Sequence, residues 1–217
     1  MNYMKFKQQL EDLKNVYESI CESVDLVLED PASEAEIIRV EKQIGKILPG
    51  EIKDFFRKFS RNCEFSAYLP SDLELPEELS EVFSACFRIG LEEVAAAEEA
   101  RMNWQTECFT NKQDEYDRVW YDKLGIMTVG NGDVIALDIG IDKENPPVVY
   151  LSHDDGEGHG YILGNTFAGY LEALLSVGAC GNEDWQMIPF CEDRMSGIDP
   201  RCKNAEAYRE IIGLPWT

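Results

Sequence analysis

One short segment carries the residue types that metal chemistry needs. Residues 153–159 read His-Asp-Asp-Gly-Glu-Gly-His and bring two imidazoles and three carboxylates together, which are common ligands of divalent metals. A metal-dependent hydrolase built here would use His153, Asp154, Asp155 and His159. However, the two histidines are the only ones in the chain, and they lie in a glycine-containing loop rather than at facing positions of a helix. We therefore favour a solvated polar loop, and we expect no metal and no cofactor.

Other catalytic arrangements are weaker still. Asp133 and Asp138 are candidate paired carboxylates for acid/base chemistry. Asp133 follows an Asn-Gly pair and is expected to support a turn by capping backbone amides. Asp138 is five residues further on, so it points to the opposite face of a strand. A cysteine nucleophile needs a neighbouring base, and the sequence places neither histidine beside a cysteine. We therefore expect that the protein is not an enzyme.

Aromatic residues interleaved with charges indicate a different kind of site. Residues 103–122 hold five aromatic side chains and show no steady period, which predicts an irregular insertion. These side chains either cap one edge of the core or form an exposed patch, since Trp and Tyr are enriched at binding hot spots. Together with acidic neighbours, they give the candidate partner-binding residues: Trp104, Tyr116, Trp120, Glu92, Glu93, Asp154, Asp155 and Glu157.

The charge of the chain restricts what such a surface can bind. The 217 residues include 20 Lys and Arg and 42 Asp and Glu, a net charge of −22. This charge excludes direct binding of nucleic acid, which needs clustered cations, and it disfavours an anionic membrane. It suits a basic protein partner, or it simply keeps the protein soluble. Residues 71–99 hold nine acids and one base, Arg88, so a concentrated negative surface is expected in the middle third.

Cysteine usage and hydropathy indicate a cytoplasmic protein. The seven cysteines form no Cys-x-x-Cys pair, which argues against a zinc ribbon or a thioredoxin-type site. No signal peptide is visible at the N-terminus, so reduced thiols fit best. Residues 160–182 are the one apolar stretch long enough to test as a membrane span. Their apolar residues follow a single helical face and are interrupted by Asn165 and Glu172, so we reject a span.

Hydrophobic periodicity predicts helices followed by strands and then more helices. Ser33 and Glu36 have the spacing of a capping box at a helix start, and Pro49 is placed for the first position of the next helix. The predicted helices cover residues 3–22, 33–48, 49–59, 91–101, 167–175 and 203–212. The predicted strands cover residues 63–69, 83–89, 124–129, 134–139, 148–151 and 185–190.

A hairpin organises the middle of the chain. Asn131-Gly132 lies between the apolar runs 124–129 and 134–139, and an Asn-Gly pair favours a type I′ turn. Strands joined by short loops should pair antiparallel. We therefore predict an α+β fold, a curved antiparallel sheet with helices packed on one face. Residues 1–217 are expected to form a single domain with a core over about 33–178, an N-terminal helix and a C-terminal extension.

Three motifs in order resemble one known family. They are LPGEIKDFFRKFS at 48–60, GNGDVIALDI at 130–139 and PPVVYLSHDDGEGHGYILGNTFAGYLEALL at 146–175. Together they resemble the SUKH superfamily, the Smi/Knr-type domain, over about residues 33–178. The chain departs from the family where Ser60-Arg61-Asn62-Cys63 replaces a Gly-rich turn, and its insertion at 103–122 is longer.

The resemblance implies a binding protein without catalysis or cofactor. Members of the superfamily include bacterial immunity proteins against polymorphic toxins, often nucleases, while eukaryotic relatives act in regulation. The first hypothesis is an immunity protein that neutralises a cognate basic toxin by occlusion. The alternative is a regulatory scaffold that has several partners and no toxin gene beside its own. The identity of the neighbouring gene separates the two hypotheses.

Overall fold

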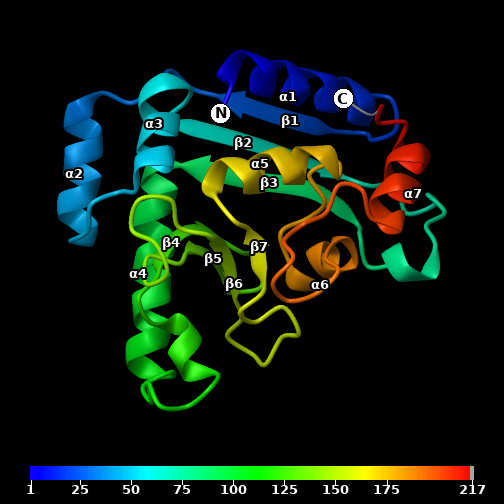
Figure 1. Cartoon of the computed structure of the whole chain (residues 1–217). Coiled ribbons are helices and arrows are strands. Elements are labelled where there is room, and N and C mark those ends of the chain that lie inside the picture. Colours follow the sequence, from blue (N-terminus) through cyan, green and yellow to red (C-terminus); the bar gives the residue numbers. More distant parts are fainter. Residues whose placement is uncertain (216–217) are drawn as a thin grey trace.

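Figure 1 shows the computed structural model, which describes residues 1–215. Helices at both ends of the chain enclose the strands, which lie mostly in its middle. The helices are α1 (Tyr3–Glu18), α2 (Glu34–Ile44), α3 (Gly50–Lys58), α4 (Leu91–Glu107), α5 (Phe167–Ser176), α6 (Asp184–Met187) and α7 (Lys203–Ile212). The strands are β1 (Val24–Leu28), β2 (Asn62–Tyr68), β3 (Ser84–Gly90), β4 (Leu124–Thr128), β5 (Val134–Leu137), β6 (Val148–Leu151) and β7 (Ile162–Gly164).

The predicted α+β fold is confirmed, with the strands divided between two sheets. One sheet has the order β1-β2-β3 and the other β4-β5-β6-β7, and every neighbouring pair is antiparallel. Helices α1 and α5 lie over the first sheet, with α3 at one end of it (Figure 1). Phe167 of α5 packs edge-on against Phe55 of α3, with ring centroids 5.6 Å apart. The first sheet and these helices therefore share one core.

The two ends of the chain meet in that core. The hydroxyl of Tyr17, at the end of α1, donates a hydrogen bond to the carbonyl of Gly178 at 2.7 Å and lies 3.1 Å from the hydroxyl of Tyr208 in α7. All three residues are separated by long stretches of sequence, and both tyrosines are fully buried. The N-terminal helix and the C-terminal helix thus pack on the same core as the central segment.

Helix α4 covers one face of the second sheet, which is buried on both faces. All residues of β5, β6 and β7 are buried. The contact between α4 and β4 is so close that a Cβ atom on Gly125 would lie 2.5 Å from the carbonyl oxygen of Ala97. Glycine at this position therefore allows the helix backbone to approach the strand.

The predicted hairpin forms, but its turn is not type I′. Strands β4 and β5 pair as expected, and Gly132 N donates to Val129 O at 3.0 Å. Within this turn, Gly132 alone has a positive φ, +102°, whereas a type I′ turn needs two such residues. Asn131 instead accepts a hydrogen bond from the backbone N–H of Asp133 at 3.0 Å. This Asx-type contact keeps Asn131 out of the left-handed region and produces a three-residue loop.

Three further elements differ from prediction. Residues 185–190 were expected to form a strand, but α6 and a 3₁₀ turn at Ile188–Phe190 occupy them. Pro189 explains this outcome, because it lacks the N–H that a strand ladder uses and fits the first positions of a helical turn. Strand β1 was not predicted, since its short run of apolar residues lies directly after a helix. Strand β7 was not predicted either, since it has only three residues. The capping box of Ser33 and Glu36 is confirmed.

Pro49 also lies one residue earlier than expected, as the N-cap residue before α3. Among the described residues, the helices are all too short or too polar to cross a membrane.

Candidate functional site

The predicted partner-binding residues fall into three groups. Trp120 and Glu93 are buried, with 0% and 7% exposure, while Trp104 and Tyr116 are half-buried. The exposed members are four acids: Glu92, Asp154, Asp155 and Glu157. The structure therefore divides these residues between the interior and the surface.

Trp120 is a core residue, so it does not serve as the predicted surface anchor. Its ring stacks on Phe109 with centroids 4.9 Å apart, and it packs against the second sheet beside Val134. Its carbonyl accepts a hydrogen bond from Arg101 Nη1 at 2.7 Å. The aromatic insertion thus caps the outer face of the second sheet, which is the first of the two alternatives that its sequence allowed.

Glu92 and Glu93 are held in ion pairs within the protein. Glu92 pairs with Arg39. The Glu93 carboxylate accepts hydrogen bonds from the Thr128 backbone N–H at 2.9 Å and hydroxyl at 2.6 Å, and Arg88 lies 3.6 Å away. Glu93 therefore fixes the end of β4 against α4, and both charges are already compensated.

Asp133 lies at the centre of a buried polar cluster. One carboxylate oxygen accepts from the backbone N–H of His153 at 2.8 Å and lies 2.6 Å from its Nδ1. The other accepts from the Tyr150 hydroxyl and from the Asn131 amide, both at 2.7 Å. Asp133 was expected to cap the turn backbone, but it joins the turn to the end of β6 instead. Burial and the neighbouring Asp133 carboxylate raise the pKa of Tyr150, so its hydroxyl remains a donor.

His159 is fixed as a neutral side chain. Its Nδ1 accepts the Ser152 backbone N–H at 3.0 Å, and its Nε2 lies 3.0 Å from the carbonyl of Tyr116. Its ring stacks on that of Tyr116 with centroids 3.7 Å apart. Burial lowers the pKa of His159. Since an acceptor at Nδ1 requires the proton on Nε2, both nitrogens are used and neither is free to bind a metal.

The structure does not assemble the metal site considered from the sequence. Among residues 1–215, the groups that come within reach of one ion are Asp133, His153 and Asp154, whose ligand atoms lie within 4.8 Å of one another. Asp133 is already saturated by four donors, as described above. His159 is directed to the backbone of Tyr116. Asp155 and Glu157 are exposed. These residues therefore form a hydrogen-bond network that holds the loop of residues 152–160.

The loop of residues 152–160 is held in place from three sides. The Tyr116 hydroxyl donates to Ser152 O at 2.7 Å and accepts from Asp155 N at 3.0 Å. The Ser152 hydroxyl donates to Asp154 at 2.9 Å, and Gly158 N donates to Asp184 at 2.8 Å. This loop therefore presents Asp154, Asp155 and Glu157 in a fixed arrangement.

Sequence reasoning missed Asp184 and Ser152, which hold this loop. Asp184 is 4% exposed and begins α6, close to where the sequence placed a strand. A local signal was present, because acidic residues such as Glu183 and Asp184 are favoured at the start of a helix. His153 lies 20 residues from Asp133, and Gly158 lies 26 residues from Asp184, so no local pattern marks these two contacts.

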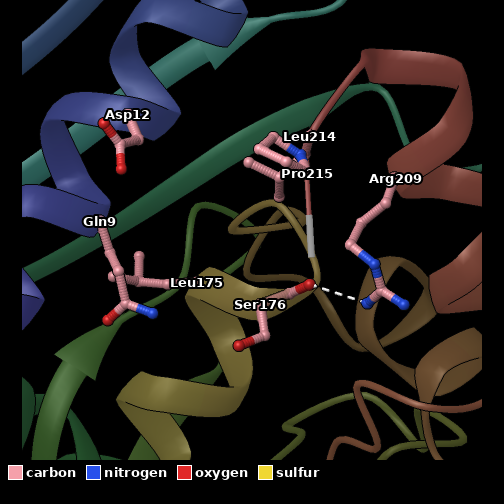
Figure 2. A pocket seen from close by; sticks show the side chains of 7 residues that line it. All are labelled: Gln9, Asp12, Leu175, Ser176, Arg209, Leu214 and Pro215. Carbon is pink, nitrogen blue, oxygen red and sulfur yellow. Dashed lines mark hydrogen bonds between the residues drawn. The ribbon is translucent and has the colours of Figure 1, made fainter. Parts of the chain in front are cut away.

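A separate crevice lies between α1, α5 and α7 (Figure 2). Its volume of about 30 Å³ is far below that of a small-molecule site, roughly 300–1,000 Å³. Arg209 points toward the end of α5 and donates from Nη1 to the carbonyls of Ser176 at 3.0 Å and Pro200 at 2.6 Å. This crevice is therefore part of the attachment of α7 rather than a ligand site.

The comparisons with known proteins agree with the fold. Residues 31–173 match the model of the SMI1 / KNR4 family (SUKH-1), which covers more than half of the chain. The chain therefore belongs to the SMI1/KNR4 (SUKH-1) family. This family includes immunity proteins, and its members are generally non-catalytic. A search of the curated proteins found no match.

Proposed function

We propose that this protein is a cytoplasmic immunity protein that neutralises a basic protein toxin by direct binding. The observation that carries the proposal is a rigid acidic surface on a chain of the SUKH-1 family. The chain has a net charge of −22, and the loop with Asp154, Asp155 and Glu157 is held by hydrogen bonds to Tyr116 and to the buried Asp184. A fixed loop loses little conformational freedom on binding, which favours affinity.

The mechanism is occlusion of the toxin's own binding surface. Toxins that act on nucleic acids need clustered cations for phosphate contacts. Carboxylates fixed on this protein would occupy such a surface in place of phosphates. The overall negative field would accelerate encounter, while the apolar contacts at the interface would slow dissociation. This mechanism needs neither a catalytic group nor a cofactor.

Co-expression with the product of the neighbouring gene tests the proposal. If the neighbouring gene encodes a toxin, the intact protein is expected to restore growth and to co-purify with that toxin. The variant D154N/D155N/E157Q should protect less. The control E107Q/E144Q/E210Q removes the same charge from exposed positions elsewhere and should protect fully. Absence of both protection and complex would rule out the proposal.

A regulatory scaffold is the second candidate, because the matching family includes regulatory proteins as well as immunity proteins. A scaffold would bind several proteins of its own cell and protect against no neighbouring toxin. The same co-expression experiment therefore separates the two functions.

A further inference from the structure

An open groove lies beside the acidic loop that connects β2 to β3. Its volume is about 710 Å³, within the range of roughly 300–1,000 Å³ that is typical of small-molecule pockets. None of the residues predicted from the sequence to bind a partner lines it. Its walls are mainly apolar and are made by Tyr68, Leu69, Leu73, Leu75, Val82 and Phe83.

Two aromatic side chains at this groove are exposed to solvent. Tyr68 is 73% exposed and Phe83 is 45% exposed. They lie at the paired ends of β2 and β3, where Leu69 N donates to Phe83 O at 2.9 Å. Aromatic side chains on a fixed backbone are the usual anchors of protein interfaces. An exposed pair therefore indicates a binding surface rather than a part of the core.

The charge around the groove is negative and uncompensated. Residues 69–83 contain no Lys or Arg. Their five acids are all exposed, and none of them forms an ion pair with another residue in the described part of the chain. These acids are Asp72, Glu74, Glu77, Glu78 and Glu81. Glu92 and Glu93 differ from them, because arginines already neutralise both.

Helix α6 joins this groove to the acidic loop of residues 152–160. Gln186 accepts hydrogen bonds from the backbone N–H groups of Phe83 at 3.3 Å and Ser84 at 3.2 Å. Two residues earlier, Asp184 accepts from Gly158 at 2.8 Å. Trp185, between them, is 41% exposed. The groove and the loop are therefore both hydrogen-bonded to the same four-residue helix.

We propose that this groove binds an apolar segment flanked by lysines or arginines on the protein partner. The inference rests on the proposed function and names the contact site within it. Apolar or aromatic partner side chains would pack on Tyr68 and Phe83, and partner cations would face the five acids. A lysine or arginine over the Tyr68 ring would add a cation–π contact. A second copy of this chain is a poor occupant, because it would bring the same uncompensated acids together.

A synthetic peptide of alternating lysine and tryptophan, labelled with a fluorophore, provides the probe. Fluorescence anisotropy should show binding to the intact protein that weakens by about tenfold or more for Y68S, a typical loss at an interface anchor. The charge variant D72N/E74Q/E77Q/E78Q/E81Q should lose binding to a similar extent. Both variants change exposed side chains, and circular dichroism will verify that they fold.

The matched control is E22Q/E99Q/E107Q/E144Q/E210Q, which has the same net charge as the charge variant. These five acids are exposed and lie outside the groove. The control should bind the peptide like the intact protein. If it binds as weakly as the charge variant, net charge alone attracts the probe, and the proposal is overturned. Equal binding by Y68S and the intact protein would also overturn it.

Two further outcomes separate this inference from the proposed function. If the peptide requires the groove but no neighbouring toxin is neutralised, the groove is supported and the immunity function fails. If a toxin is neutralised equally well by the intact protein and Y68S, the immunity function is supported and the groove proposal fails. Dimerisation of the intact protein that Y68S abolishes would assign the groove to a second copy and overturn the proposal.

Discussion

The indole of Trp104 stacks on the imidazole of His153 with ring centroids 4.5 Å apart and an interplanar angle of 29°. The indole Nε1 also donates to the carbonyl of Gly132 at 3.0 Å. The C-terminal half of α4, the β4–β5 turn and the end of β6 therefore meet at one point. Asp133 lies beneath this contact.

Loss of the Asp133 carboxylate should destabilise the fold. The variant D133A leaves the buried Tyr150 hydroxyl and the N–H groups of His153 without an acceptor. Unsatisfied buried donors cost about 1–3 kcal/mol each, so we expect a loss of about 3 kcal/mol in the free energy of unfolding. Urea denaturation followed by circular dichroism measures it. The control D72A changes an exposed acid and should shift stability by less than about 0.5 kcal/mol, and an equal effect of both variants would refute the role of Asp133.

The close approach of α4 to β4 predicts a strong effect of one methyl group. In G125A, the new Cβ would lie 2.5 Å from the Ala97 carbonyl oxygen, so helix and strand must separate. We expect a loss of about 2–4 kcal/mol, at the upper end of overpacking effects. Gly50 offers a matched control, since nothing lies within 4 Å of a Cβ there and alanine favours its helix. G50A should unfold at the same or a higher temperature, while a stable G125A would contradict the packing.

The buried pair of Glu98 and Arg101 predicts part of the acid sensitivity. Burial disfavours the charged carboxylate, but the bidentate contact of Arg101, at 2.8 Å to each oxygen, acts together with Lys46 and the Gly125 N–H to outweigh burial and lower the pKa of Glu98. A lowered pKa in the folded state stabilises the protein above the unfolded pKa of about 4.3. This stability is lost as pH falls through the folded pKa.

We therefore expect the intact protein to lose stability below about pH 4.3, and to do so more steeply than E98Q, which lacks the titrating group. Thermal melts from neutral to acidic pH measure the difference. E107Q, at an exposed position of the same helix, should follow the intact protein. Identical pH profiles for E98Q and the intact protein would show that folding does not lower the pKa of Glu98.

The Tyr116 hydroxyl should control the order of the acidic loop. In Y116F, the N–H of Asp155 loses its acceptor and the carbonyl of Ser152 loses its donor. We expect the Asp155 amide to exchange with solvent about tenfold faster, which corresponds to the loss of about one hydrogen bond. Hydrogen–deuterium exchange monitors this amide. Y68F removes an exposed hydroxyl and should leave exchange unchanged, whereas an unaffected loop in Y116F would contradict the proposed rigidity.

Local patterns predicted the elements whose signals lie within a few residues. The capping box of Ser33 and Glu36 and the apolar stripe of α5 needed no distant contact, and residues 203–212 form α7 as predicted. The candidate site could not be predicted from such local patterns, because it depends on contacts between distant residues. The role of Asp133 depends on Tyr150 and His153 from another strand, and the burial of Trp120 depends on how α4 and the insertion pack over β5 and β6. The sequence predicted the negative charge of residues 71–99. It did not show that arginines neutralise Glu92 and Glu93, or that the acids near Tyr68 form no ion pair in the described part of the chain.

Charge-driven encounter predicts a steep salt dependence. If the acidic surface steers a basic partner, the association rate should fall by more than about tenfold between roughly 0.01 M and 0.15 M salt, as screening shortens the range of the field. The dissociation rate should change much less. Stopped-flow fluorescence with the co-purified toxin measures both rates. A salt-independent association rate would mean that the acidity serves solubility alone.

Titration of toxin activity with the purified protein tests the central claim most directly. The toxin made by the neighbouring gene is assayed at a fixed concentration well above the expected dissociation constant, while this protein is added in increasing amounts. If the protein inhibits the toxin by occlusion, activity should fall linearly to a fixed stoichiometric ratio, and this fall should coincide with complex formation in size-exclusion chromatography. Full toxin activity at a large excess of this protein would contradict it.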